Sequence, residues 1–254
     1  MESRFRAADI GLGLRTARYA VTDWLVPHKT IVDIPLGFEG EAVLGIGREV
    51  TTDLSMLHLD MWAGRMWLPR RTTLLVTDVW AYGYYSDGGI ESGSSRGQFS
   101  VYQAATGGQW LVRIAGERLL SPDPDVRALA TVDPLIRFLS PHTRLAETAL
   151  LATLERSWHV WSPIQSFTLD GALFTTASRR EGNLSQDGSS ETVYAAVIGA
   201  GIRIVPTTSG VGPGRFDIIY PLARSPTLAR KLLLSISVAP WLGADRHRDS
   251  FRDR

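Results

Sequence analysis

Apolar and polar residues alternate with a period of two through most of the chain, most clearly over residues 193–242. Alternation of this kind places successive side chains on opposite faces of a β-strand. In this segment one set is apolar, whereas the other is rich in Gly, Ser, Thr, Arg and Asp, which indicates a polar or closely packed second face. Repeated along a chain, the pattern is typical of a membrane β-barrel with an apolar exterior and a polar lumen.

The alternation predicts eleven strands, and residues 19–26 would add a twelfth. Several of them exceed the usual globular strand of about 5–6 residues, whereas a membrane-spanning strand needs about 9–11. The fold class we predict is all-β: an antiparallel up-and-down transmembrane β-barrel, or the C-terminal portion of one, of about 11–12 strands with almost no helix. The predicted strands are residues 8–14, 32–46, 57–67, 72–85, 98–106, 109–119, 148–160, 167–177, 193–205, 215–222 and 231–242.

The strand pattern extends over one domain, residues 1–242, which is followed by a charged C-terminal tail, residues 243–254. Residues 86–98 and 179–191 have the Gly, Ser and charge composition of surface loops. Residues 121–145 contain four prolines, which cannot donate ladder hydrogen bonds. The same segment is too apolar for a solvated loop, so we expect it to pack against the rest of the protein.

Composition excludes several classes of function. The 27 basic and 26 acidic residues leave a net charge of +1, so no nucleic-acid-binding surface is expected. The chain has no cysteine, which excludes disulfides, thiolate zinc sites and thiol catalysis. Its N-terminus has no apolar signal region, so no secretory signal is visible. Six of the eight tryptophans fall near predicted strand ends, where an interfacial aromatic girdle would place them: Trp24, Trp67, Trp110, Trp158, Trp161 and Trp241.

Residues 199–222 contain an ordered set of motifs: Gly199-x-Gly201-x-Arg203, then Gly212-Pro213, then Arg215-x-Asp217-x-x-Tyr220-Pro221-Leu222. The set resembles the closing strands of the bacterial surface-antigen barrels, which include the outer-membrane assembly factor and its translocation relatives. Residues 154–158 and 232–241 are similar to two further strands of that family, so the resemblance covers about residues 148–242. It implies a 16-stranded barrel whose sixth outer loop folds back into the lumen.

In that family the lumenal loop carries an Arg-Gly-aromatic motif, which Ile136-Arg137-Phe138 matches here without the glycine. An arginine in a lumen needs acidic partners, because an unpaired charge beside low-dielectric walls is costly. We therefore expect Arg137 to lie within salt-bridge reach of Glu155, Asp170 or Asp217. These four residues are the candidates for a loop lock, with ordinary solvated charges in a wet channel as the alternative.

Strand parity makes a further prediction about facing. Charged side chains cannot contact lipid cheaply, so Arg203, Arg215 and Asp217 should point inward. Their alternating neighbours, such as Ile202 and Phe216, should then point outward.

No signal for catalysis or cofactor binding appears. The five histidines lack metal-ligand spacing, no G-x-S-x-G motif is present, and the Gly-rich stretch at 210–214 is not followed by the lysine of a phosphate loop. We therefore expect no enzyme activity, no metal and no cofactor.

The resemblance implies an outer-membrane barrel that assists insertion or translocation of polypeptides. Its partners would be membrane lipid or lipopolysaccharide, together with client polypeptides. Two alternatives stay open: a passive outer-membrane pore with the same architecture, and a soluble β-sheet binding protein.

Overall fold

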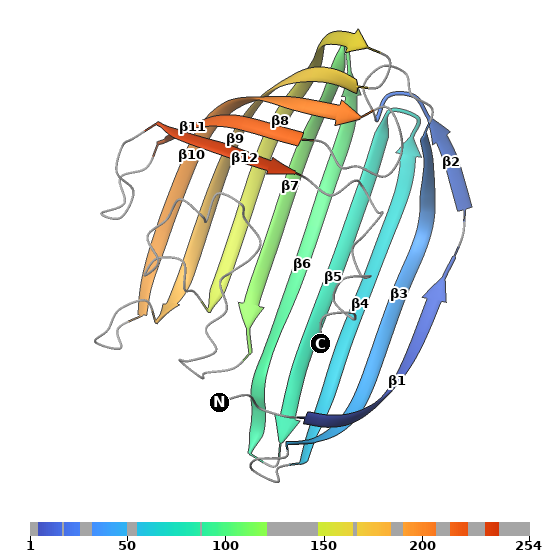
Figure 1. Cartoon of the computed structure of the whole chain (residues 1–254), viewed down its shortest axis with the longest axis vertical. Helices are drawn as coiled ribbons and strands as arrows, with labels where there is room; N and C mark the ends of the chain where they lie inside the picture. Colours follow the sequence, from blue (N-terminus) through green and yellow to red (C-terminus); the bar gives the residue numbers. More distant parts are fainter. Residues whose placement is uncertain are drawn as a thin grey trace.

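The computed structural model describes residues 5–16, 18–25, 32–49, 55–86, 88–120, 147–164, 167–183, 190–206, 214–222 and 232–238. These residues form one antiparallel sheet of twelve strands, and no helix occurs among them. The strands are β1 Phe5–Arg15, β2 Arg18–Thr22, β3 Val32–Glu49, β4 Ser55–Arg70, β5 Thr73–Ser86, β6 Gly89–Ala105, β7 Gly108–Leu119, β8 Thr148–Ile164, β9 Phe167–Asn183, β10 Ser190–Pro206, β11 Gly214–Pro221 and β12 Leu233–Val238. The predicted all-β, up-and-down architecture is confirmed (Figure 1).

Sequential strands are neighbours along the whole sheet, with β1 and β12 at its two edges. The exception is β2, which pairs with β3 on the same side as β1. β1 ends at Arg15 and β2 begins at Arg18, so the two are consecutive pieces of one edge strand interrupted near Thr16. Gly37 permits this interruption, because its φ is 124° and a Cβ there would lie 2.6 Å from Thr16 Oγ1.

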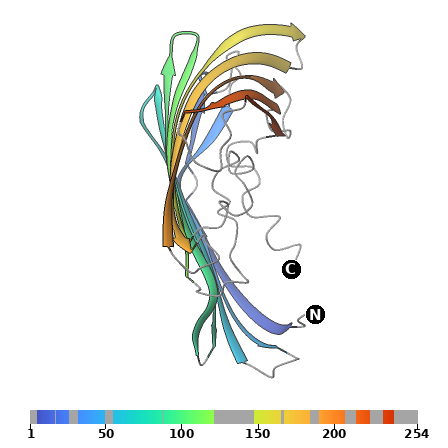
Figure 2. The same cartoon turned by 90° about the vertical axis from the view of Figure 1, so that its left-hand side faces the viewer.

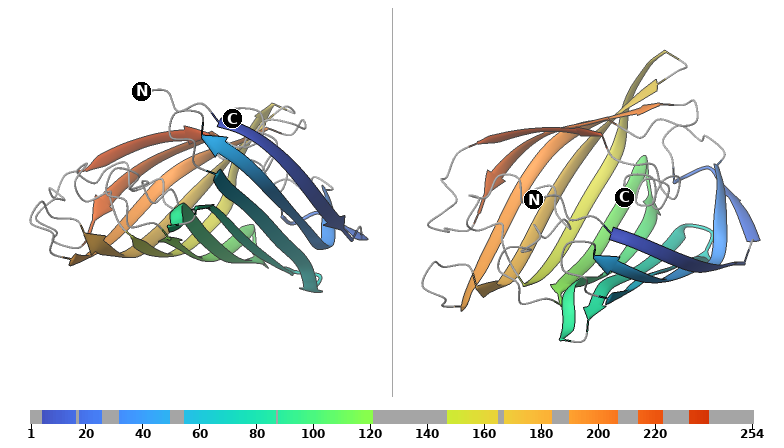
Figure 3. Two further views of the ribbon diagram at one scale, coloured as in Figure 1. Left: turned by 90° about the horizontal axis from the view of Figure 1, so that it is seen from below. Right: turned by 60° about the horizontal axis from the view of Figure 1, so that its bottom comes forward.

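The sheet is curled rather than flat, and its edges bend toward one another (Figures 2 and 3). Arg215 on β11 lies 3.2 Å from Glu155 on β8, although two strands separate them. Adjacent strands are about 4.8 Å apart, so a flat sheet would hold β8 and β11 about 14 Å apart. The curl therefore brings charged side chains of β8, β10 and β11 together on the concave face.

The convex face carries the apolar set of nearly every strand. The strand register places these apolar side chains opposite one another on neighbouring strands, for example Ile10 opposite Leu44 and Phe216 opposite Ile236. Large hydrophobic residues between 38% and 78% exposed on this face are Ile10, Leu12, Leu14, Leu44, Ile46, Leu57, Met61, Val79, Phe99, Val112, Ile114, Leu150, Leu154, Leu173, Ile198, Ile202, Ile204, Phe216, Ile218, Leu234 and Ile236.

Two loop predictions are wrong in part. Most of residues 86–98 belong to β6, which begins at Gly89, and β9 continues to Asn183. Small side chains in β6 serve packing: Ser94 donates a hydrogen bond to Glu117 Oε1 at 3.3 Å, and a Cβ on Gly93 would approach the Tyr82 carbonyl oxygen to 2.8 Å. Residues 121–146 and 239–254, which include the predicted packed loop and the tail, lie outside the described residues.

Candidate functional site

Among the described residues, charged side chains from β8, β10 and β11 meet on the concave face, with an aromatic ring from β9 between them. We call this group the ion-pair cluster: Glu155 on β8, Phe174 on β9, Arg203 on β10, and Arg215 and Asp217 on β11. Its charged members are unusually buried, because Asp217 is 3%, Arg203 8% and Glu155 9% exposed. Charges at such burial require paired partners, since taking an ion out of water costs several kcal/mol.

Each carboxylate of the ion-pair cluster contacts both arginines. Arg203 donates from Nη1 to Asp217 Oδ1 at 2.6 Å and from Nη2 to Glu155 Oε2 at 3.1 Å. Arg215 lies 3.2 Å from Glu155 through Nη1, and its Nε donates to Asp217 Oδ2. Two positive and two negative charges therefore alternate, and the cluster joins β8 to β11 across the curve of the sheet.

The ring of Phe174 lies beneath the arginines. The guanidinium carbons of Arg215 and Arg203 are 4.8 and 5.9 Å from the ring centroid, within the range of cation–π attraction. The Cζ end of the ring lies against Gly199, where a Cβ would overlap the ring atoms. A second glycine, Gly201, leaves room for the ion pair, because a Cβ there would overlap Asp217 Oδ1.

The predicted facing of these strands is confirmed. Arg203 and Asp217 are buried on the concave side, whereas Ile202 is 49% and Phe216 40% exposed on the convex side. The remaining motif residues divide between the faces: Tyr220 is exposed on the convex side, and Pro221 is fully buried on the concave side.

Of the four loop-lock candidates, Glu155 and Asp217 belong to the ion-pair cluster. Asp170 lies opposite Arg203 in the β9–β10 register and is 4% exposed, and its Oδ1 is 3.3 Å from His159 Nδ1. Arg137 lies outside the described residues, so its pairing stays a prediction. The arginines seen with the carboxylates are Arg203 and Arg215, which the sequence placed in a strand motif without naming their partners.

The N-terminal half of the concave face carries further polar groups. Trp80 donates from Nε1 to Asp60 Oδ1 at 3.0 Å, and the ring of His58 stacks on Tyr84 with centroids 4.8 Å apart. Asp60 is 8% and Glu117 also 8% exposed. His58 and Asp60 are two residues apart on β4, so the strand period of two predicts that both polar side chains share one face.

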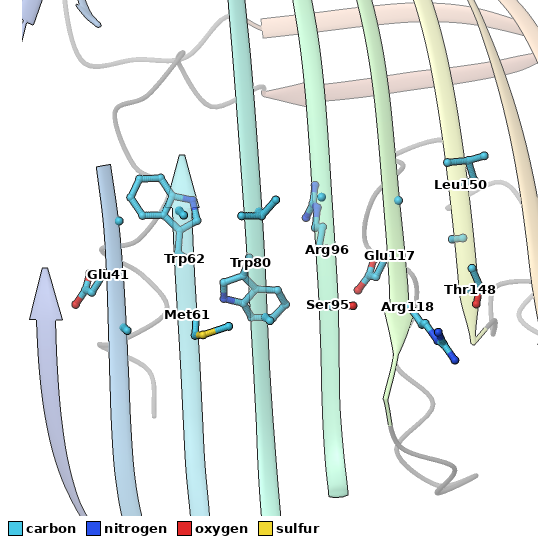
Figure 4. A pocket seen from close by; sticks show the side chains of 18 of the residues that line it. Glu41, Met61, Trp62, Trp80, Ser95, Arg96, Glu117, Arg118, Thr148 and Leu150 are labelled. Carbon is cyan, nitrogen blue, oxygen red and sulfur yellow. The ribbon is translucent and has the colours of Figure 1, made fainter. Parts of the chain in front are cut away.

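A shallow groove with a volume of about 950 Å³ crosses the convex face from β1 to β9. Glycine and alanine residues form part of its lining, and Leu150 and Met61 are among the larger apolar side chains (Figure 4). Arg118, Arg179 and Glu181 lie at its β7–β9 end, and the charged residues Glu41, Arg96 and Glu117 also belong to its lining. Its small residues are Gly13, Gly40, Ala42, Ala63, Ala81, Gly97 and Gly116.

The described residues contain no helix long and apolar enough to cross a membrane. Within the same residues, no group of three or more His, Asp or Glu side chains could hold a metal ion.

Replacing Gly201 by Ala should lower the free energy of unfolding by about 1–3 kcal/mol, because the new methyl group forces the ion pair to move. Denaturant unfolding followed by tryptophan fluorescence measures the change. Gly116→Ala is the matched control, since its Cβ would meet only ordinary contacts of 3.7 and 3.8 Å. Equal effects of the two substitutions would contradict the packing role of Gly201.

Comparison of the chain with models of protein families, with curated proteins and with solved structures gave no match.

Proposed function

We propose that this chain forms the wall, or part of the wall, of an outer-membrane β-barrel. In this proposal the convex face contacts lipid and the concave face lines a polar lumen. The supporting observation is the distribution of the two residue classes, with buried ion pairs on the concave face and exposed large hydrophobic side chains on the convex one. An apolar exterior of this kind is that of a barrel in a membrane. The concave face combines the ion pairs with buried apolar clusters around Leu74 and Phe174.

Strand length supports the same proposal. Six strands contain 16 to 18 residues: β3, β4, β6, β8, β9 and β10. At about 3.3 Å per residue and a tilt of about 40°, 17 residues rise about 43 Å. A bilayer with its headgroups is about 40–45 Å thick. Each of these strands could therefore cross the hydrocarbon core and both interfaces.

A soluble β-sheet protein is the less favourable alternative. Soluble monomers rarely expose a contiguous apolar patch above a few hundred Å². Here the exposed apolar side chains extend without interruption from β1 to β12. Lipid acyl chains provide the simplest cover for such a surface, and the groove with arginines at one end fits an acyl chain whose headgroup carries phosphate.

Assistance of polypeptide insertion is the more specific function that we propose within this class. Its support is the pair of open edges in the described sheet, because an edge strand presents unpaired backbone groups to an incoming strand. At the β12 edge, Leu234 is 61% and Ile236 78% exposed. A passive pore would instead need these edges to close on each other.

Single cysteines labelled with an environment-sensitive fluorophore test the membrane proposal, since the chain has no cysteine of its own. In lipid vesicles, the label on Leu154→Cys should emit at shorter wavelength and be quenched by brominated acyl chains. The label on Thr153→Cys, one residue away on the concave face, should not. Equal quenching by a water-soluble quencher at both positions would contradict a lipid-facing convex surface.

A further inference from the structure

Three side chains near the end of β8 and the start of β9 form a continuous hydrogen-bonded chain. Ser162 Oγ lies 3.5 Å from His159 Nε2, and His159 Nδ1 lies 3.3 Å from Asp170 Oδ1. The serine is exposed and the carboxylate is buried. We propose that Ser162, His159 and Asp170 form a nucleophilic triad that hydrolyses carboxylic esters.

The order of groups is the one that such chemistry requires. The acid and the serine contact different nitrogens of one imidazole, so the ring can take a proton from the hydroxyl while the acid orients it. The distance of 3.5 Å between Ser162 and His159 is long for a hydrogen bond, and catalytic contacts of this kind tighten when substrate binds. None of this depends on a G-x-S-x-G motif, because the triad is defined by geometry.

A β-bulge brings the serine to the histidine. In a regular strand, residues 159 and 162 would point to opposite faces, because side chains alternate with a period of two. The pairing of β8 with β9 runs from His159 opposite Asp170 to Trp161 opposite Leu169, so two steps on β8 match one on β9. The extra residue reverses the parity and turns Ser162 to the face of His159. Bulges are over-represented beside active sites for this reason.

A buried hydroxyl of unexplained role lies next to the triad. Thr168 is 2% exposed, and its Oγ1 has no hydrogen-bond partner in the described structure. It occupies the β9 position between the pairs Trp161–Leu169 and Ile164–Phe167, opposite the segment that contains Ser162. An unsatisfied buried hydroxyl is costly, so the packing around Thr168 leaves a polar group beside β8 without compensation.

The reaction follows from these positions. His159 Nε2 takes the proton of the Ser162 hydroxyl while Oγ attacks the ester carbonyl carbon. The bond between that carbon and the alkoxy oxygen then breaks, and the leaving alcohol receives the proton from His159. Water attacks the acyl-serine, loses a proton to His159, and releases the carboxylic acid as Ser162 is reprotonated. The net reaction is ester plus water to acid plus alcohol.

The surroundings indicate a lipid ester as the substrate, an assignment that rests on the proposed membrane location. Val160 is 60% and Trp161 57% exposed beside the serine. An exposed tryptophan at a strand end is typical of the membrane interface, where acyl esters lie. The triad itself does not depend on a membrane, so activity on a soluble ester tests it separately.

The test uses the full chain folded in detergent micelles, with p-nitrophenyl butyrate as soluble ester and a fluorophosphonate as covalent probe. We expect ester hydrolysis, and mass spectrometry should locate the probe on Ser162. Ser162→Ala should lower kcat/KM at least about 1,000-fold and abolish labelling. Ser157→Ala, on the same strand, is the matched control and should retain both.

Asp170 is a positioning residue, so Asp170→Asn should lower kcat while KM stays within about twofold. Circular dichroism confirms that each variant is folded. Absence of hydrolysis and of labelling in the folded wild-type chain, or hydrolysis that survives Ser162→Ala, would overturn the triad. Phosphatidylethanolamine vesicles should release free fatty acid. Hydrolysis of the soluble ester without this release would overturn only the lipid substrate.

Discussion

Replacing Arg203 by Met should lower the free energy of unfolding by about 3–5 kcal/mol. The substitution removes the side chain that contacts both Asp217 at 2.6 Å and Glu155 at 3.1 Å. These carboxylates are 3% and 9% exposed, so water cannot replace the lost partner. Arg215 is left to neutralise two negative charges at once. Denaturant unfolding of the protein in lipid vesicles, followed by tryptophan fluorescence, measures the loss.

Arg179→Met is the matched control for this prediction. Arg179 also forms an ion pair, with Glu181 at 2.8 Å, but both side chains are about half exposed, at 50% and 49%. An exposed pair contributes about 0–1 kcal/mol, because water and salt screen it. The two arginine substitutions should therefore differ by at least about 2 kcal/mol. A similar small loss for both would mean that water enters the ion-pair cluster.

Strand parity was the part of the fold that could be predicted from the sequence. In β10 the even-numbered residues from Tyr194 to Ile204, and in β11 those from Phe216 to Tyr220, are apolar or aromatic, and all of them lie on the convex face. Arg203 and Asp217 consequently faced the concave side as expected. Strand order was equally accessible, because short turns such as the one at Thr106 and Gly107 permit only antiparallel neighbours.

The first part of β6 could not be predicted, because most of its residues are Gly, Ser or charged, and only Ile90 is β-branched. Strand formation there depends on ladders with β5 and β7, which use backbone groups only. The need for small side chains arises from the neighbours, as the close approach of Gly93 to the Tyr82 carbonyl oxygen illustrates. The composition of residues 89–96 alone does not reveal such a contact with a neighbouring strand.

The acidic members of the ion-pair cluster were predicted, whereas their partners were not. Glu155 on β8 and Arg203 on β10 are 48 residues apart in the chain. They meet because the two strands are separated only by β9 and the sheet curves toward this face. The contact of Ser162 with His159 was hidden for a different reason. It depends on a bulge that reverses strand parity, and parity was the rule on which the prediction relied.

Arginine substitutions on the convex face test whether lipid or water surrounds that face. Ile198 and Ile204 lie on the same face of β10, and each is 47% exposed. Ile198 is at the middle of the strand. Ile204 is six residues further on, a distance of about 20 Å along the strand and about 15 Å along the membrane normal at a tilt of about 40°. In a bilayer, Ile198 would be near the midplane and Ile204 near the interface.

We expect Ile198→Arg to lower the free energy of unfolding by about 2–4 kcal/mol and Ile204→Arg by about 0–1 kcal/mol, because the cost of a lipid-facing arginine depends on depth. Unfolding from lipid vesicles with denaturant gives both values. In a soluble protein, two side chains of equal exposure would tolerate arginine equally, with changes within about 0.5 kcal/mol. The difference between the two variants therefore decides whether lipid or water covers the convex face, independently of any assignment of activity to the concave one.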